Sequence, residues 1–399
     1  MSEDRLALAV ADVNWATTES LFRELDEPGV ETLALRCMDY RNAWRKGITP
    51  WSAGARRALA DGPRHWKRDV ALPPGLLKRL PALGMRPIAR AVRRFWAERP
   101  GARRGLVATY PYYLRLAEVL RPDALIYYNF DDYALYWPDR AEELRGWEDE
   151  LVRRADVTIC AALAMAEELR RRVPSAADRV RHMPHGTPAA FLASRPLDRP
   201  GPAPADVADL PRPLLGYVGS LEDRLDWSLL DAVAEAFPEA SVVLVGRPPE
   251  PGPEPWREEC RRTLARPNAH ALGWRGQEEL PSYYQAFDVN LIPYLVDHPF
   301  NLACSPTKIM DGMGATRPMV ATAVPECRLY THLFDVAGSR DEFVAAVGRI
   351  VAAGSDDGRA ALRRAHAAVN TCAKVAARIV AALPPSRPRA RPAIGAASR

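Results

Sequence analysis

The segment between positions 304 and 320, CSPTKIMDGMGATRPMV, combines side chains suited to binding phosphate. Ser305 and Pro306 predict a helix start, because a hydroxyl can cap free amides and proline needs no N–H at the first helical position. Lys308 would lie in the first turn, with Asp311 one turn further along the same face. A helix N-terminus with a lysine attracts phosphate, and an acid one turn deeper could bind a ribose hydroxyl pair. The segment predicts a nucleotide-diphosphate site; the alternative is a surface ion pair between Lys308 and Asp311.

A glycine turn after an apolar run is a second candidate for phosphate binding. Residues 214–218 read LLGYV and are followed by Gly219 and Ser220. A glycine lets backbone amides approach a phosphate closely, although an ordinary turn between a strand and a helix has the same pattern. Arg224, a few residues later, could add positive charge.

Two neighbouring acids, Asp131 and Asp132, end the strand-like run IYYNF. The carboxyl ends of strands face the ligand crevice in open parallel sheets, so a carboxylate there could act as a general base. The alternative is that one of the pair caps the next turn or pairs with arginines. Three residues after the first predicted strand could line the same crevice: Asp12, Asn14 and Trp15.

Composition places the 399-residue chain among globular proteins, with 48% hydrophobic and 26% charged residues. The six cysteines are scattered without a Cys-x-x-Cys pair, which indicates neither a zinc site nor a disulfide framework and favours a reducing cytosol. The first residues resemble neither a signal peptide nor a membrane span. We therefore expect a cytoplasmic protein.

Positive charge is concentrated in the first half of the chain. Between positions 40 and 121 there are nineteen Lys or Arg and four Asp or Glu, a net charge of +15, whereas the whole chain carries +5. Residues 74–99 mix basic with aliphatic and aromatic residues, which suits a helix lying on an anionic membrane surface. The alternative is a helix packed on its own domain with a solvated arginine face. Nucleic acid is not expected, since no binding motif is visible.

Alternation of strand and helix patterns predicts an α/β protein with two doubly wound parallel sheets facing a cleft. We expect a first domain at residues 1–193 with an irregular basic insertion at about 40–100, and a proline-rich linker at 194–213. A second domain would cover 214–383, and 384–399 would be a disordered tail. The predicted strands of the first domain are 5–13, 31–36, 105–109, 124–129, 157–160 and 180–183. Those of the second are 214–219, 241–245, 269–272, 289–292 and 319–322.

The segment around Lys308 resembles the donor-site helix of GT-B glycosyltransferases (group 1, or family 4), whose bacterial polysaccharide branch commonly reads S/N-P-x-K-x-x-E-Y-x-A-A-G-K-P-V-V. The matching positions are Ser305, Pro306, Lys308, Ala315, Pro318 and Val320. Asp311 stands where the family has a ribose-binding glutamate, and Arg317 replaces a lysine. Thr316 occupies a usual glycine position. Ala303 lacks the first glutamate of the Glu-x7-Glu pair found in retaining relatives.

The resemblance extends over most of residues 105–383 and implies further roles. Gly273 and Trp274 correspond to the strand end beside the nucleobase, although a tryptophan packed in the core is the alternative. The run MPHG at 183–186 resembles the segment leading into the interdomain hinge, where His185 would be structural rather than catalytic.

Together these features predict a glycosyltransferase that moves a sugar from a UDP- or GDP-sugar to a glycan or lipid-linked acceptor. The resemblance implies that amides near Gly219, Ser220 and Thr307, with Lys308, would bind the diphosphate. Asp131 or Asp132 would be the base, and neither a cofactor nor a metal is expected. Two alternatives are a degenerate binding or scaffold protein and a nucleotide-sugar epimerase of the same fold.

Overall fold

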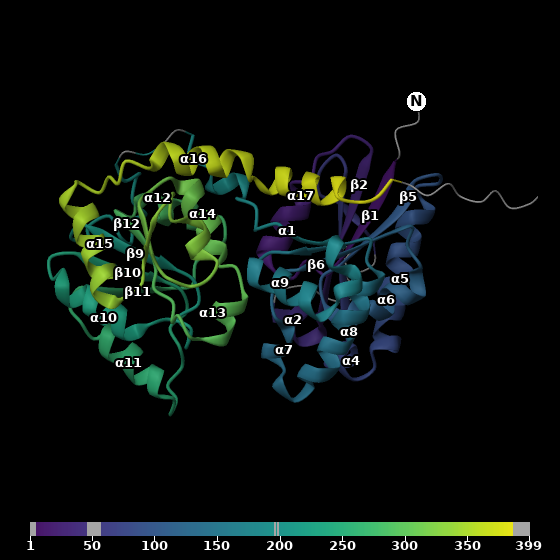
Figure 1. Ribbon diagram of the computed structural model, residues 1–399, viewed down its shortest axis with the longest axis horizontal. Coiled ribbons are helices and arrows are strands. Elements are labelled where there is room, and N and C mark those ends of the chain that lie inside the picture. The colour runs from purple at the N-terminus through teal and green to yellow at the C-terminus, as the bar shows by residue number, and fades with distance from the viewer. Residues whose placement is uncertain (1–4, 46–56, 195–196, 198, 386–399) are drawn as a thin grey trace, which may run out of the picture.

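The computed structural model describes residues 5–45, 57–194, 197 and 199–385, and shows two α/β domains side by side (Figure 1). Each domain contains one sheet with helices on both faces. The two sheets confirm the predicted fold class, because both are doubly wound and predominantly parallel. The predicted disordered tail, 384–399, lies outside the described residues from position 386 onward.

The sheet of the first domain has the strand order β3-β4-β2-β1-β5-β6-β7-β8, and all neighbours are parallel except β3 and β4. Its strands are β1 (Leu6–Ala11), β2 (Val30–Asp39), β3 (Leu59–Ala60), β4 (His65–Leu72), β5 (Arg103–Ala108), β6 (Ala124–Asn129), β7 (Val157–Cys160) and β8 (Val180–His182). Its helices are α1 (Ala16–Arg23), α2 (Tyr40–Arg45), α4 (Leu76–Arg79), α5 (Pro81–Ala97), α6 (Leu114–Leu120), α7 (Tyr133–Tyr136), α8 (Ala141–Arg154) and α9 (Leu163–Arg172).

The second sheet is entirely parallel, in the order β11-β10-β9-β12-β13-β14. Its strands are β9 (Leu214–Val218), β10 (Ser241–Val245), β11 (Ala269–Gly273), β12 (Val289–Ile292), β13 (Met319–Thr322) and β14 (Asp335–Ala337). Its helices are α10 (Trp227–Ala236), α11 (Pro255–Leu264), α12 (Leu280–Ala286), α13 (Pro299–Ala303), α14 (Thr307–Ala315), α15 (Arg340–Ala352) and α16 (Ala360–Val369), followed by α17 (Cys372–Ala381).

The strand order reverses once in each sheet, and both reversals matter for ligand binding. β1 lies between β2 and β5, and β9 lies between β10 and β12. Every residue of β1 and β9 is buried, as expected for strands covered on both faces. Ligands of doubly wound folds bind beyond the carboxyl ends of the strands at such reversals. These are the turns after Ala11 and after Val218.

Much of the predicted irregular insertion at about 40–100 is regular structure, so that expectation was wrong. β4 pairs with β2 along eight residues and extends the first sheet. The 17-residue helix α5 covers the sheet. Residues 46–56 lie outside the described part of the chain. The strand pattern of β4, HWKRDVAL, was hidden because β4 lies near the sheet edge and carries polar residues, whereas a central parallel strand reads as a continuous apolar run.

The apolar side of α5 packs into its own domain. Ile88, Val92, Phe95 and Trp96 are buried in the first core, and the Trp96 indole donates to the carbonyl of Ala7 at 3.0 Å. These apolar side chains are therefore not available to a membrane, and their packing agrees with the alternative of a helix packed on its own domain. The other side of α5 is exposed and basic.

Two chain crossings connect the domains and lie against each other. Thr187 on the first crossing and Thr371 on the second form an isolated parallel bridge, with the Thr187 amide donating to Asn370 and the Cys372 amide donating to Thr187. A Cβ at Gly186 would lie 2.5 Å from the Cα of Cys372, which explains the glycine. After the second crossing, α17 packs against α1 in the first domain, although its residues fall within the predicted second domain (Figure 1).

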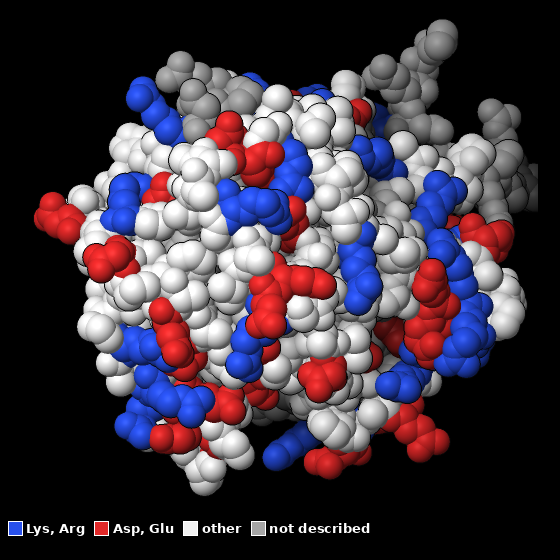
Figure 2. All heavy atoms as spheres, turned by 60° about the vertical axis from the view of Figure 1, so that its left-hand side comes forward, with Lys and Arg blue, Asp and Glu red and all other residues white. Residues whose placement is uncertain are grey.

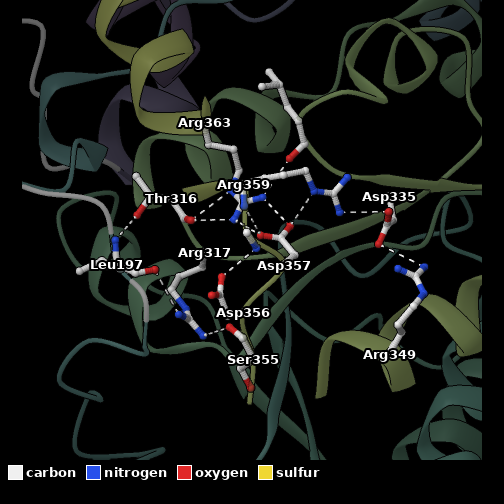
Figure 3. Close-up of polar contacts among 12 residues, drawn as sticks. Leu197, Thr316, Arg317, Asp335, Arg349, Ser355, Asp356, Asp357, Arg359 and Arg363 are labelled. Atoms are coloured by element: carbon white, nitrogen blue, oxygen red, sulfur yellow. Dashed lines mark hydrogen bonds and ion pairs between the residues drawn. The ribbon is translucent and has the colours of Figure 1, made fainter. Parts of the chain in front are cut away.

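Two buried arginines fix the carboxyl end of α14 (Figure 3). Arg317 donates to the carbonyls of Phe287 (3.0 Å), Ser355 (3.1 Å), Asp288 (3.3 Å) and Leu197 (3.4 Å). Arg363, from α16, donates to the carbonyl of Thr316 and to the carboxylate of Asp357. These guanidinium groups join the end of α14 to four other segments.

Thr316, which occupies a position where the resembling family usually has glycine, takes part in the same network. Its backbone has φ 63°, a left-handed conformation that favours glycine. The Thr316 hydroxyl accepts from the amide of Leu197 at 2.9 Å, and its carbonyl accepts from Arg363. These hydrogen bonds offset the backbone strain, which costs on the order of 1 kcal/mol.

The surface of the second domain carries mixed rather than single-sign charge. In Figure 2, basic and acidic side chains lie next to one another on the face that is turned forward. Local pairs such as Arg261 with Glu258 on α11 account for part of this pattern. The excess of positive charge between positions 40 and 121 of the sequence lies in the first domain.

Replacing Arg317 by methionine is expected to lower the free energy of unfolding by about 3 kcal/mol, because several buried carbonyls lose their donor. Urea unfolding of the variant and of the wild type measures the change. Arg261→Met, which removes an exposed arginine, is the control and should change stability by less than about 0.5 kcal/mol. Equal losses in both variants would contradict the structural role of Arg317.

Candidate active site

Three adjoining cavities lie at the carboxyl ends of both sheets, between the domains. Their volumes are about 1010, 530 and 130 Å³. Gly219 and Gln277 line all three, so the cavities meet beside the turn after β9. The medium cavity is lined by residues of both domains and is called the cleft below.

The backbone of the turn after β9 lies close to Lys308 and to the end of β10. Gly219 has φ 150°, and a Cβ there would lie 2.4 Å from Cε and 2.6 Å from Nζ of Lys308. A Cβ at Gly246, at the end of β10, would lie 1.9 Å from the carbonyl oxygen of Gly219. The glycines therefore bring the ends of β9 and β10 together, with Gly219 against the lysine. Gly219 and Ser220 both line the cleft.

The amino end of α14 opens into the same cleft. The helix begins at Thr307 after Pro306, one residue later than the sequence suggested, and no side chain caps it. Ser305, Thr307 and Lys308 line the cleft. The uncapped amides of the first turn and the partial positive charge of the helix end suit an anion.

The Lys308 ammonium lies over two aromatic rings of the second core. Its Nζ is 5.6 Å from the ring centroid of Tyr217 and 5.8 Å from that of Tyr294. Each ring face attracts a cation weakly, so the rings orient the ammonium without neutralising it. Lys308 thus presents a positive charge beside Gly219.

Asp311 lines the small cavity, one turn behind Lys308. Burial raises the pKa of the Asp311 carboxyl to about 7, and the nearby Lys308 opposes this rise. Within the described residues, Asp311 and Lys308 form no ion pair. The Lys308 ammonium lies over Tyr217 and Tyr294 instead. Asp311 therefore lies one turn deeper along α14 than Lys308, beside the small cavity that both residues line.

The neighbouring acids of the first domain have different surroundings. Asp132 caps α7, its carboxylate accepting from the Ala134 amide at 3.0 Å, and it does not line the cleft. Asp131 does line the cleft; it accepts from the Cys304 thiol at 2.6 Å and from the Tyr136 hydroxyl at 2.5 Å. Burial raises the pKa of Asp131, against these hydrogen bonds. Of the two neighbouring acids, Asp131 is therefore the one that faces the cleft.

His185 joins the two sides of the cleft. Its Nδ1 lies 3.3 Å from the Tyr128 hydroxyl of β6, and the imidazole also hydrogen-bonds the backbone of Ser305. Burial lowers the pKa of His185 to about 4, so the ring is neutral near pH 7. These contacts fit the structural role expected for His185, although the ring also lines the cleft.

Trp274 is 68% exposed and lines both the cleft and the large cavity, so the alternative of a tryptophan packed in the core was wrong. Gly273 precedes it with φ 76° and lines neither cavity. Arg275 is held by Asp206 and Tyr283, at 2.6 and 2.9 Å. Arg224 lines the cleft, with its guanidinium 5.6 Å from the ring centroid of Phe300.

Several cleft residues were not singled out from the sequence. They come from short segments without a recognisable motif: Tyr136, Gln277, Phe300 and Cys304. Their only sequence signal was proximity to a motif, since Tyr136 follows the acid pair and Cys304 precedes Ser305. Trp15, proposed for the crevice, does line the cleft, whereas Asp12 and Asn14 do not.

Neither a metal-ligand cluster nor a membrane-spanning helix was found in the described part of the chain. There, no three or more His, Cys, Asp or Glu side chains are grouped so that they could hold a metal ion. No helix among these residues is both long and apolar enough to cross a membrane.

A family model described as "Glycosyl transferases group 1" matches residues 212–371, which include the Gly219 turn and α14. Most of the second domain thus matches the group 1 glycosyltransferases. It is 22% identical over 276 residues to TuaH of Bacillus subtilis (strain 168), a protein named as a glycosyltransferase of teichuronic acid biosynthesis. The match covers 66% of this chain and 68% of that relative.

Solved structures of glycosyltransferases share the GT-B fold of the chain. Sucrose-phosphate synthase from Thermosynechococcus elongatus superimposes with a TM-score of 0.69 at 16% identity, covering 94% of this chain and 98% of that chain. Anabaena Alr3699/HepE in complex with UDP gives a TM-score of 0.63 at 14% identity, covering 96% and 99%.

Replacing Asp311 by asparagine is expected to raise the melting temperature of the ligand-free protein more at pH 8 than at pH 5. A carboxyl whose pKa is raised to about 7 in the folded state makes the wild type lose stability as the pH rises toward 7, and asparagine removes this loss. Thermal unfolding of both proteins at the two pH values measures the effect. The same difference at both pH values would contradict the buried position of the carboxyl.

Proposed function

We propose that this glycosyltransferase moves a sugar from a nucleotide-diphosphate sugar to a glycan or lipid-linked acceptor in polysaccharide biosynthesis. One observation carries the proposal: the amino end of α14 with Lys308 faces the same cleft as Asp131 of the other domain. An anion-binding helix end opposite a carboxylate suits the departure of a diphosphate and the deprotonation of an acceptor hydroxyl.

In this proposal the second domain binds the donor. The amides near Gly219, Ser220 and Thr307 and the Lys308 ammonium would stabilise the negative charge that develops on the leaving diphosphate. Arg224 would add charge, Asp311 would bind the ribose, and Trp274 would stack on the base. A UDP-sugar is the first choice over a GDP-sugar, because the structurally similar HepE is described in complex with UDP and with UDP-glucose.

The first domain would supply the base. As the acceptor oxygen bonds to the anomeric carbon, the bond from that carbon to the diphosphate breaks and Asp131 takes the hydroxyl proton. The raised pKa of Asp131 makes it a stronger base than an exposed aspartate. The acceptor hydroxyl would replace the Cys304 thiol or the Tyr136 hydroxyl as the donor to Asp131.

We further propose that the protein is cytoplasmic and contacts the inner membrane face through residues 74–99, where a lipid-linked acceptor would be reached. The exposed side of α5 carries Arg86, Arg90 and Arg94, and the nearby Leu80 and Leu83 are also exposed. Basic side chains beside exposed leucines are attracted to anionic lipid. Contact through this basic side leaves the buried apolar side of α5 in the core.

A nucleotide screen tests the proposed function. Thermal unfolding with UDP, GDP and dTDP should show a higher melting temperature with one of them, since a ligand that binds only the folded state stabilises it. UDP is expected to give the largest increase. No increase with any of the three would contradict a donor site. Turnover of a nucleotide sugar to its epimer would instead identify an epimerase.

Replacing Lys308 by alanine should lower the turnover of the donor on the order of 100-fold, if the ammonium supplies about 3 kcal/mol to the transition state. Release of the nucleoside diphosphate measures the rate. Lys374→Ala on the exposed side of α17, away from the three cavities, is the matched control and should retain wild-type activity. Unchanged kinetics in Lys308→Ala would remove the lysine from the mechanism.

Co-sedimentation with liposomes tests the membrane contact. The double variant Arg86→Glu/Arg90→Glu should bind phosphatidylglycerol vesicles at least about 10-fold more weakly than the wild type at low salt, because basic residues near the surface contribute about 1 kcal/mol each. Arg261→Glu/Arg262→Glu on α11 changes the charge equally in the second domain and should bind like the wild type. Wild-type protein that remains in the supernatant would contradict the contact.

A further inference from the structure

We infer that the acceptor of this glycosyltransferase presents an uncharged pyranose ring to the first domain, and that the ring stacks on Trp15. The inference rests on the proposed function and specifies its acceptor. It depends on the side chains of the first-domain wall of the cleft, on the position of Trp15, and on the kind of ligand that suits both.

The first-domain wall of the cleft contains no lysine or arginine among the described residues. It consists of aromatic, small polar and acidic side chains together with one histidine: Trp15, Thr17, Phe130, Asp131, Tyr136 and His185. The histidine is neutral near pH 7, because burial lowers its pKa to about 4. The charge on this wall is therefore the carboxylate of Asp131.

Both cations that line the cleft, Arg224 and Lys308, belong to the second domain. They lie on the side where the donor diphosphate would bind. A phosphate placed against the first-domain wall would meet a carboxylate without a cation from that wall, which is unfavourable in a partly enclosed site. The charge distribution therefore favours a neutral acceptor group over a lipid phosphate at this wall.

Trp15 occupies the turn after β1, where the strand order of the first sheet reverses. Its side chain is 49% exposed, yet its indole Nε1 donates to the Tyr110 hydroxyl at 2.7 Å. Tyr110 is buried and stacks on Tyr112 with ring centroids 5.2 Å apart. The hydrogen bond holds a large exposed ring in one orientation at the cleft, which reduces the entropy lost when a ligand stacks on it.

Trp15 is also an unusual residue for its local position. It precedes the first residue of α1 and makes no side-chain capping hydrogen bond. Serine, threonine, aspartate or asparagine would stabilise this helix end by about 1 kcal/mol. The local structure therefore gives no reason for tryptophan, whereas the cleft does.

A pyranose ring matches these surroundings. One face of the ring carries mainly C–H groups, which pack on the flat surface of an indole. The ring edge carries hydroxyl groups, which can donate to Asp131 and exchange hydrogen bonds with the Tyr136 hydroxyl. Stacking on Trp15 would thus bring one hydroxyl of the acceptor toward the carboxylate proposed as base.

Kinetics with soluble acceptor probes test the inference. The probes are p-nitrophenyl pyranosides of glucose, galactose, mannose and N-acetylglucosamine, compared with a polyprenyl phosphate in detergent, each supplied with UDP-sugars. At least one pyranoside should accelerate UDP release. Trp15→Ala should raise the KM for that pyranoside about 10-fold or more, while Trp15→Phe recovers most of the loss.

Two controls separate acceptor binding from folding and from donor binding. Trp44→Ala removes a first-domain tryptophan that is 79% exposed and lies outside the three cavities, so it should leave the KM unchanged. The increase in melting temperature caused by UDP should be the same in Trp15→Ala and in the wild type. A loss of this increase in Trp15→Ala would show that the indole contacts the donor, against the inference.

The remaining outcomes distinguish failure of the acceptor inference from failure of the proposed function. If UDP stabilises the protein but polyprenyl phosphate accepts sugar and no pyranoside does, the inference is wrong and the proposed function stands. An unchanged KM in Trp15→Ala likewise contradicts it. If no nucleotide binds to the wild type, the proposed function fails first, and the acceptor inference fails with it.

Discussion

Hydrogen bonds from two buried guanidinium groups hold the carboxyl end of α14 and thereby determine where its amino end points. Arg317 and Arg363 join that end to β12, to the loop after α15 and to α16, while the paired chain crossings lie along the helix. Thr187 on one crossing donates to the carbonyl of Met310 in the middle of α14. A nine-residue helix held at its end and middle can present its first turn to the cleft without its own cap.

Charge is divided between the domains in the same way as the proposed chemistry. The second domain supplies the helix end and both cations of the cleft, Lys308 and Arg224, together with the acids Glu222 and Asp223. The first domain supplies Asp131 and aromatic rings, and no cation among the described residues. The Cys304 thiol donates to Asp131 across the cleft, so the carboxylate of the first domain lies close to the segment that leads into α14 of the second. Acid and cations are thereby brought together without forming an ion pair.

Local sequence patterns predicted the parts whose structure depends on near neighbours. The β9 turn and α14 were found because glycine, proline and lysine have strong local preferences, and several strand boundaries, such as those of β6 and β7, agree with the expected ranges. Local patterns failed for β4, whose polar residues hide its pairing with β2, and for α5, whose basic residues suggested lipid although its apolar side packs into the core.

The sequence by itself determined the fold class, which follows from the periodicity of apolar residues. It also located the segment around Lys308, because the serine, proline and lysine of that segment lie at short spacings along the chain. Only the tertiary structure showed that Asp131 rather than Asp132 lines the cleft and that Trp274 is exposed. It also brought Trp15, Tyr136 and Cys304 to one cleft. These outcomes depend on contacts between residues as far as 173 positions apart, and no local preference encodes which distant segments meet.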